Sequence, residues 1–391
     1  MKLGVLKEAQ DEPRCAAIPE TVGKLVAKGA RVAVERGAGE RAGFSDAAFE
    51  DAGATIVSRE EAIADAHAIL VVQGPPPADL AGAKSGALLI GSLSPATRGD
   101  TIEAYAKAGI EALAMEWMPR ITRAQSMDIL SSQSNLAGYK AVIDAAHLYG
   151  RAFPMMMTAA GTISPARVFV MGVGVAGLQA IATATRLGAQ VSATDVRSAT
   201  KEQIQSLGAK PIFVEDVEGI EGEGQGGYAG ETSEEYRKAQ AELVSNHLAK
   251  QDIVITTALI PGRPAPRLIS DAQLSTMRAG SVVVDLAAEA GGNVEGCTAG
   301  ATVERHGVQI MGPVQPARAL ASDAAALYSR NIANFLLAFI EESSAESEED
   351  AHSDSAGDSP WLVLPDDDEI VAGIRLTKGG KIVHERLRAM G

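Results

Sequence analysis

The residues best suited to chemistry lie in one stretch, RAQSMDILSSQSNLAGYKAV, at positions 123–142. It contains Arg123, Gln125, Asp128 and several hydroxyl groups, but no pair of groups placed for acid–base catalysis. Donors and acceptors of these kinds can orient a ring without exchanging protons with it. Because the stretch stands just before a nucleotide-binding fingerprint, it suits hydride transfer between two nicotinamide rings.

The fingerprint lies in RVFVMGVGVAGLQAIATATRLGAQVSATDVR, residues 167–197. The pattern predicts a strand, a tight turn, a helix from about Val175 and a second strand that ends at Asp195. Three glycines have the GxGxxG spacing, which allows the turn, the approach of a pyrophosphate and close packing of helix on strand: Gly172, Gly174 and Gly177. Asp195 follows the last of them by 18 residues, as an acid that binds a ribose hydroxyl should. We therefore predict a dinucleotide site, the alternative being glycines that only form a tight turn.

The residues after the second strand bear on the choice of cofactor. A carboxylate at Asp195 accepts hydrogen bonds from the adenosine ribose and repels a 2′-phosphate, which favours NAD over NADP. Arg197 could pair with a 2′-phosphate or stack on the adenine. Stacking is the favoured interpretation, since a phosphate would still have to sit beside Asp195.

Composition excludes several classes of protein. Of the 391 residues 46% are hydrophobic and 22% are charged, as in an ordinary globular protein. No apolar run approaches the roughly 20 residues of a membrane span, and MKLGVLKEAQ lacks the apolar core of a signal peptide. Cys15 and Cys297 are the only cysteines, so a reducing cytoplasm is expected rather than a disulfide framework. The six histidines are scattered and predict no metal site.

The net charge of −15 belongs mainly to one segment. Residues 341–369 contain 12 acidic and no basic side chains, and without them the chain has 38 acidic and 35 basic ones. No basic patch or aromatic platform is visible, so nucleic acid is not expected as a partner.

The alternation of short apolar runs with amphipathic segments predicts an α/β fold with two Rossmann-like, parallel-sheet domains separated by a cleft. A helix over about 128–149 should connect them. A long amphipathic helix from Ser322 should return to the first domain and make it discontinuous. The predicted limits are 1–133 with 322–391 for the first domain and 134–321 for the NAD(H)-binding domain.

Two further segments stand out. Six glycines between Gly219 and Gly230 predict either a mobile lid with Tyr228 near its tip or a solvated insertion. The acidic, serine-rich linker 341–359 is not expected to fold, and the terminal residues should form a hairpin that turns at Gly379 and Gly380.

Several segments resemble, nearly word for word, the NAD(H)-binding domain I of the proton-translocating NAD(P) transhydrogenase family: PRITRAQSMDILSSQSNLAGYKAVIDAA, MMMTAAGT, VMGVGVAGLQAIATATRLGA, ATDVR, GGYA and TTALIPGRPAP. The resemblance covers about residues 1–340 and the terminal hairpin. Alanine dehydrogenase has the same fold, and GVLKE with Arg14 resembles it too.

The resemblance implies a set of site residues. Those at the nicotinamide end would be Arg120, Gln125, Asp128, Ser131 and Tyr228, with Asp128 orienting Arg120 or Gln125. The other NAD(H) contacts would be Gly172, Gly174, Val175, Gly177, Asp195, Val196, Arg197, Gly227, Gln240 and Leu259. A helix start capped by Ser126 is the alternative interpretation of the first stretch.

The resemblance also implies a function. The chain would be a dimeric, cytoplasm-facing subunit on the inner face of the cell membrane, which exchanges hydride between NADH and NADP+ bound on a partner domain. Partner chains would supply the proton channel and the NADP-binding domain. An alanine-type dehydrogenase is the alternative, but its lysine and histidine fall near Val71 and Ser94, and Glu8 and Arg14 are interpreted as structural remnants. A non-catalytic NAD-sensing module is a further alternative.

Overall fold

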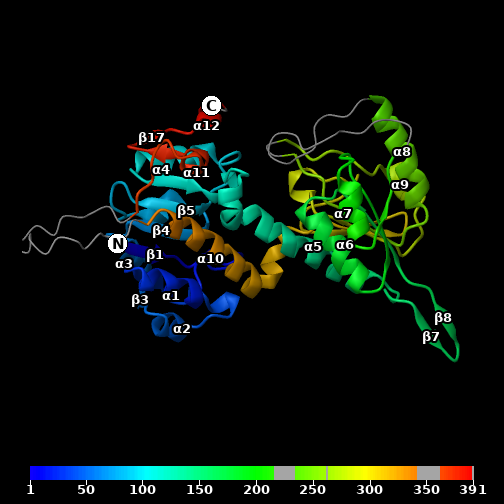
Figure 1. Ribbon diagram of the computed structural model, residues 1–391, viewed down its shortest axis with the longest axis horizontal. Helices are drawn as coiled ribbons and strands as arrows, with labels where there is room; N and C mark the ends of the chain where they lie inside the picture. The colour runs from blue at the N-terminus through cyan, green and yellow to red at the C-terminus, as the bar shows by residue number, and fades with distance from the viewer. Residues whose placement is uncertain (215–233, 261–262, 341–361, 390–391) are drawn as a thin grey trace, which may run out of the picture. The chain divides into compact units, whose positions relative to one another are not determined.

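The computed structural model describes residues 1–214, 234–260, 263–340 and 362–389. They belong to two compact units, one made of residues 1–132 and 321–391 and the other of residues 133–320. Each unit is a parallel or mainly parallel sheet covered by helices (Figure 1).

The first unit contains a six-stranded sheet in the order β3-β2-β1-β4-β5-β6, and all its pairings are parallel. The strands are β1 (Lys2–Val5), β2 (Arg31–Glu35), β3 (Thr55–Val57), β4 (Ala68–Gln73), β5 (Leu88–Ser92) and β6 (Glu111–Ala114). The main helices are α1 (Pro19–Ala27), α2 (Asp46–Asp51), α3 (Arg59–Ile63), α4 (Gly99–Lys107), α10 (Ala321–Ala338), α11 (Glu369–Ile374) and α12 (Glu385–Arg388). The strand order reverses direction between β1 and β4.

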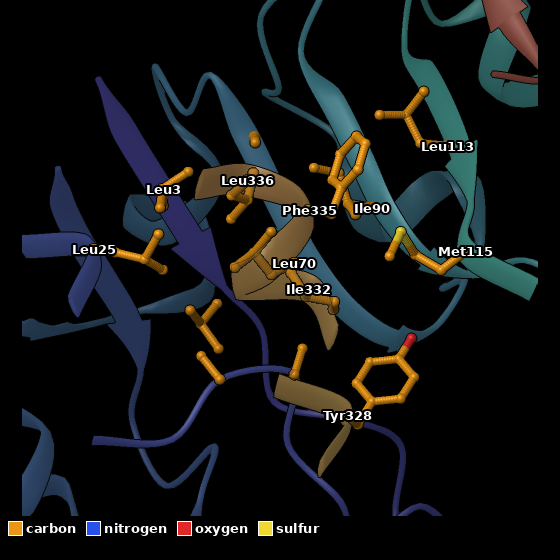
Figure 2. Close-up of a cluster of buried hydrophobic side chains, with 14 of the residues drawn as sticks. Leu3, Leu25, Leu70, Ile90, Leu113, Met115, Tyr328, Ile332, Phe335 and Leu336 are labelled. Atoms are coloured by element: carbon orange, nitrogen blue, oxygen red, sulfur yellow. The ribbon is translucent and has the colours of Figure 1, made fainter. Parts of the chain in front are cut away.

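Helix α10 joins this unit from far along the chain, as its amphipathic pattern predicts. Its apolar side chains recur at helical spacing, so they form one stripe: Tyr328, Ile332, Phe335 and Leu336. Figure 2 shows this stripe against Leu3, Leu70 and Ile90 of the sheet and against Met115, which directly follows β6. These side chains are buried, so the helix completes the core on this face of the sheet.

The second unit contains a seven-stranded sheet in the order β11-β10-β9-β12-β13-β15-β14. Its strands are β9 (Arg167–Met171), β10 (Gln190–Thr194), β11 (Lys210–Pro211), β12 (Ile253–Thr256), β13 (Val282–Asp285), β14 (Thr302–Arg305) and β15 (Val308–Met311). The helices are α6 (Val175–Arg186), α7 (Thr200–Ser206), α8 (Glu234–Leu248) and α9 (Asp271–Leu274), preceded by α5 (Ile129–Leu148), most of which lies in this unit.

The α/β class is confirmed, with two differences in the strands. β14 was not predicted and pairs antiparallel with β15, because His306 and Gly307 have positive φ angles of 52° and 74° and form a two-residue turn. The apolar run KPIFV, residues 210–214, forms a strand only over Lys210–Pro211 at the sheet edge, where Pro211 has no N–H to donate.

Two hairpins complete the described structure. The predicted terminal one is confirmed, since β16 (Thr377–Lys378) pairs antiparallel with β17 (Lys381–Ile382) around Gly379 and Gly380. The other, β7 (Met156–Thr158) with β8 (Gly161–Ile163), was not predicted. Linker residues 341–359 and the glycine-rich segment with Gly227 and Tyr228 lie outside the described residues.

Candidate dinucleotide-binding site

The turn after β9 is shaped by its first and last glycines. Gly172 has φ +99°, and a Cβ on it would lie 2.6 Å from Thr257 Oγ1. A Cβ on Gly177 would lie 1.9 Å from the carbonyl oxygen of Gly172. Thr257 Oγ1 also donates to that carbonyl at 2.9 Å. The glycines therefore let α6 pack directly on the turn, as the spacing predicts.

Gly174 differs from its two neighbours in the motif. It precedes the first residue of α6, and a Cβ on it would meet no heavy atom within 4 Å. The chain itself therefore does not require a glycine here. A ligand phosphate that approaches the N–H groups at the start of α6 would require one, because any side chain would block its path.

The sheet topology places this turn where ligands bind in open α/β folds. β9 pairs with β10 on one side and with β12 on the other, so the strand order reverses at its carboxyl end. Ligands of such sheets bind outside the carboxyl ends of the strands at that reversal. Gly172 after β9 and Thr257 after β12 both lie there.

Asp195 lies directly after β10 and is buried, with 8% of its surface exposed. Its Oδ2 accepts the N–H of Val173 at 2.7 Å, which fixes the carboxylate against the glycine turn. Arg197 pairs with the same carboxylate through Nε at 2.9 Å and Nη2 at 3.0 Å. The structure thus pairs Arg197 with Asp195, and the stacking of Arg197 on an adenine stays a prediction.

The remaining predicted contacts of the second unit lie on three elements. Val175 begins α6 and is 39% exposed, and Val196 is half-buried beside Asp195. Gln240 lies half-buried on α8. Leu259 is 43% exposed in the segment after β12. That segment is held by the buried Asn293, which sequence reasoning missed and whose side chain bonds the N–H and the C=O of Ala258.

Four of the five predicted nicotinamide residues lie in the first unit, around a short helix, η4 (Thr122–Met127), and the fifth, Tyr228, lies outside the described residues. Arg120 and Gln125 are exposed, and Asp128 immediately precedes α5. Asp128 accepts the N–H and the hydroxyl of Ser131 at 3.0 and 2.6 Å. It therefore caps α5. The role that the family resemblance implies for Asp128, orienting Arg120 or Gln125, stays a prediction. The alternative cap, Ser126, is wrong, because α5 begins only at Ile129.

Residues more than 200 positions away hold this loop in place. Asn331 and Asn334 of α10 donate to the carbonyl oxygen of Ser126 at 2.8 and 3.0 Å. Arg123 pairs with Asp368, the N-cap of α11, at 2.7 Å. Sequence reasoning missed these partners, since nothing local connects them with the loop, and it assigned no structural task to Arg123.

No group of three potential metal ligands occurs in the part of the chain that the structure describes. At the two positions where an alanine-type dehydrogenase is expected to carry its lysine and histidine, Val71 is buried and Ser94 is exposed, with φ +53°. Glu8 accepts the N–H groups of Val72 and Gln73 at 2.6 and 3.1 Å, and Arg14 pairs with Glu12 at 2.7 Å. No described helix is long and apolar enough to cross a membrane.

The fold and the glycine turn together define an α/β protein of the dinucleotide-binding class. More specifically, the chain belongs to the alanine dehydrogenase/PNT family: the N-terminal domain model matches residues 4–137 and the C-terminal domain model matches residues 141–357. This confirms the resemblance identified from the sequence.

Comparison with individual proteins favours one branch of the family. The chain is 50% identical, over 100% of both chains, to a Rhodospirillum rubrum protein that forms the first part of NAD(P) transhydrogenase subunit alpha. A transhydrogenase structure from Sinorhizobium meliloti matches with a TM-score of 0.86 and 48% identity, covering 98% of this chain and 100% of that one. An L-alanine dehydrogenase structure matches with a TM-score of 0.79 at 25% identity, covering 100% and 99%. Alanine dehydrogenase is thus the more distant relative.

Proposed function

We propose that this chain is the NAD(H)-binding subunit of a proton-translocating NAD(P) transhydrogenase. In this role it would be an oxidoreductase that exchanges a hydride between NADH and NADP+ held on a partner domain. The observation that carries the proposal is the full-length identity of 50% to a transhydrogenase alpha subunit. The open position at Gly174 and the buried carboxylate of Asp195 support it.

We assign the two ends of the substrate to different elements. The diphosphate would bind at the start of α6, where Gly174 and Val175 offer backbone N–H groups and the positive end of the helix dipole. The N–H of Gly172 is donated to the C=O of Thr194, so Gly172 would contribute through the shape of the turn. Asp195 would accept hydrogen bonds from the adenosine ribose. Val196, Gly227, Gln240 and Leu259 remain proposed contacts.

On the family resemblance, we assign the nicotinamide end to the loop around η4. Arg120 and Gln125 are exposed there, and between them they carry the donors and the acceptor that a carboxamide needs. Asp128 and Ser131 are bonded to each other, so their main contribution would be to fix where α5 begins. NADH supplies the hydride, and these side chains would set the angle of the ring without moving protons. Tyr228 is proposed on the family resemblance alone.

The proposed partners follow from the same relatives. Their name describes a fraction of an alpha subunit, so other chains would carry the NADP-binding domain and the membrane proton channel. This chain would then lie on the cytoplasmic face of the membrane. We also propose a homodimer, which the β7–β8 hairpin and the residue before it support: exposed fractions of 60% at Met155, 78% at Met157 and 40% at Ile163 are high for apolar side chains.

The test is stopped-flow transfer between NADH on this chain and NADP+ on a separately added NADP-binding domain. The chain alone should bind NADH yet barely reduce NADP+, and the partner should restore rapid exchange. Because direct transfer needs the reacting carbons roughly 3 to 3.5 Å apart, Gln125→Asn should lower the transfer rate far more than it weakens NADH binding. Full activity without a partner, or NADH formation from alanine by the chain alone, would contradict the proposal.

A further inference from the structure

The carboxylate of Asp195 has no acceptor position left for a ligand. Oδ1 accepts the backbone N–H and the Nε of Arg197, both at 2.9 Å. Oδ2 accepts the N–H of Val173 at 2.7 Å and Nη2 of Arg197 at 3.0 Å. A carboxylate has about four lone-pair sites in all, and these four bonds use them.

Two of the four bonds can be exchanged and two cannot. The bonds from the N–H groups of Val173 and Arg197 come from the main chain of the glycine turn and of the segment after β10. The other two come from the guanidinium of Arg197. This group stands at the end of a flexible side chain that is 11% exposed. A ribose hydroxyl that donates to Asp195 must therefore displace the side chain of Arg197.

We propose that Arg197 competes with the adenosine ribose for Asp195 and thereby sets how strongly the site selects a ribose hydroxyl. The inference rests on the proposed NAD(H) function. When the hydroxyl binds, the guanidinium leaves the carboxylate, so the gain from the new hydrogen bond is partly offset by the lost ion pair. A nucleotide without that hydroxyl leaves the pair intact and avoids the offset.

The same pair bears on the rejection of NADPH. A free carboxylate at this position would repel a 2′-phosphate by its full charge. The guanidinium neutralises part of that charge and can itself pair with a phosphate. Arg197 therefore lowers the preference for NADH over NADPH, although it stands beside the residue that creates that preference.

The test compares two ligands on two proteins. Dissociation constants are measured for NADH and for its analogue with 2′-deoxyadenosine, on the wild type and on Arg197→Met, which keeps most of the length of the side chain without its charge. The dissociation constant of the analogue divided by that of NADH should be at least about fivefold larger in the variant than in the wild type. A hydrogen bond to an ionised acceptor accounts for a factor of roughly 10 or more when nothing offsets it. The NADH preference over NADPH should rise in the variant too.

Two further variants keep the result interpretable. Lys201→Met removes a nearby positive charge that lies over the Phe213 ring at 5.0 Å, and it should leave the ratio unchanged. Arg197→Lys keeps the charge but not the bidentate pairing, so its ratio should fall between those of the wild type and Arg197→Met. It also provides the test if Arg197→Met does not fold. A ratio that is unchanged or smaller in both Arg197 variants would overturn the competition. A wild type that binds no NADH would instead overturn the proposed function.

Discussion

The first five strands of the two sheets follow the same order, yet the sheets differ after the first strand in that order. Each has its first strand, β1 or β9, in the middle, with the order reversing beside it. After β9 the chain makes a glycine turn and enters α6 at Val175. After β1 it continues through residues 6–18 before α1 begins at Pro19.

That longer segment fills the carboxyl ends of the first sheet with the chain's own side chains. Glu8 accepts the N–H groups of Val72 and Gln73, and Arg14 and Glu12 form a buried ion pair. The hydroxyl of Tyr328 in α10 accepts the N–H of Ser92 and donates to the carbonyl oxygens of Val71 and Val72. A place that could hold phosphates is thus occupied by carboxylates and a phenol. Both sheets have a point of reversed strand order at the carboxyl end of their first strand. The segment that follows this strand determines whether a ligand can bind there.

The largest effect should come from Gly177→Ala. The new Cβ would meet the carbonyl oxygen of Gly172 at 1.9 Å, and backbone cannot move aside without distorting the turn. We expect a loss of stability of about 2–4 kcal/mol and NADH binding weakened by about 100-fold or more, measured by denaturant unfolding and fluorescence titration.

The matched control is Gly23→Ala in α1 of the first unit. Its Cβ would come no closer than 4.0 Å to the carbonyl oxygen of Ala52. Alanine is the better helix former by about 1 kcal/mol, so this variant should be as stable as the wild type or more stable. Equal losses of stability and of NADH binding in Gly177→Ala and Gly23→Ala would show that the turn after β9 has no special need for a glycine.

Gly174→Ala should weaken binding without weakening the fold. The Cβ meets no atom of the chain, but it would project where a diphosphate has to approach. The expected result is unchanged thermal unfolding of the free protein with NADH affinity lowered by about tenfold. NADH affinity equal to that of the wild type would show that the phosphates do not bind at this turn.

Glu8 gives the first unit a dependence on pH. Burial raises the pKa of Glu8 from 4.5 to about 7, against the lowering effect of its bonds from Val72 and Gln73. Between these two values the folded chain binds more protons than the unfolded chain, so this group makes the free energy of unfolding fall as the pH rises from about 4.5 to about 7.

Glu8→Gln should remove that slope. The stability of the wild type relative to the variant should decrease by on the order of 1–3 kcal/mol between about pH 5 and about pH 8. The histidines with a lowered pKa, such as His247 at about 4, give a slope of the opposite sign, but they are present in both proteins and cancel in the difference. A difference that stays constant with pH would show that Glu8 is ionised throughout.

The smallest effect concerns the pair of Arg123 with Asp368. It is partly exposed, so its loss should cost less than about 1 kcal/mol of stability. Because Arg123 lies in the loop with Gln125, Arg123→Ala should slow hydride transfer by about two- to fivefold while the dissociation constant of NADH stays the same. Arg330→Ala breaks the exposed pair with Glu20 and should leave the transfer rate unchanged. Equal rates in both variants would mean that the loop needs no such support.

Local patterns in the sequence predicted the parts of the site that local physics builds. The glycine turn, α6 and Asp195 follow one another within residues 167–197, so spacing alone was informative. The partners of the nicotinamide loop could not be found in this way, because Asn331 reaches Ser126 from 205 positions away. The conformation of Arg197 was also missed, since several arrangements of an arginine suit the same sequence.

The comparison of the two sheets is tested most directly by counting nucleotides. Equilibrium dialysis with radiolabelled NADH should give one bound molecule per chain for the wild type. For Gly174→Val, which obstructs the turn after β9 more than alanine does, it should give none over the same concentration range. Two molecules per chain, or one that survives in Gly174→Val with unchanged affinity, would show that the first sheet binds the nucleotide and that the two sheets do not differ as described.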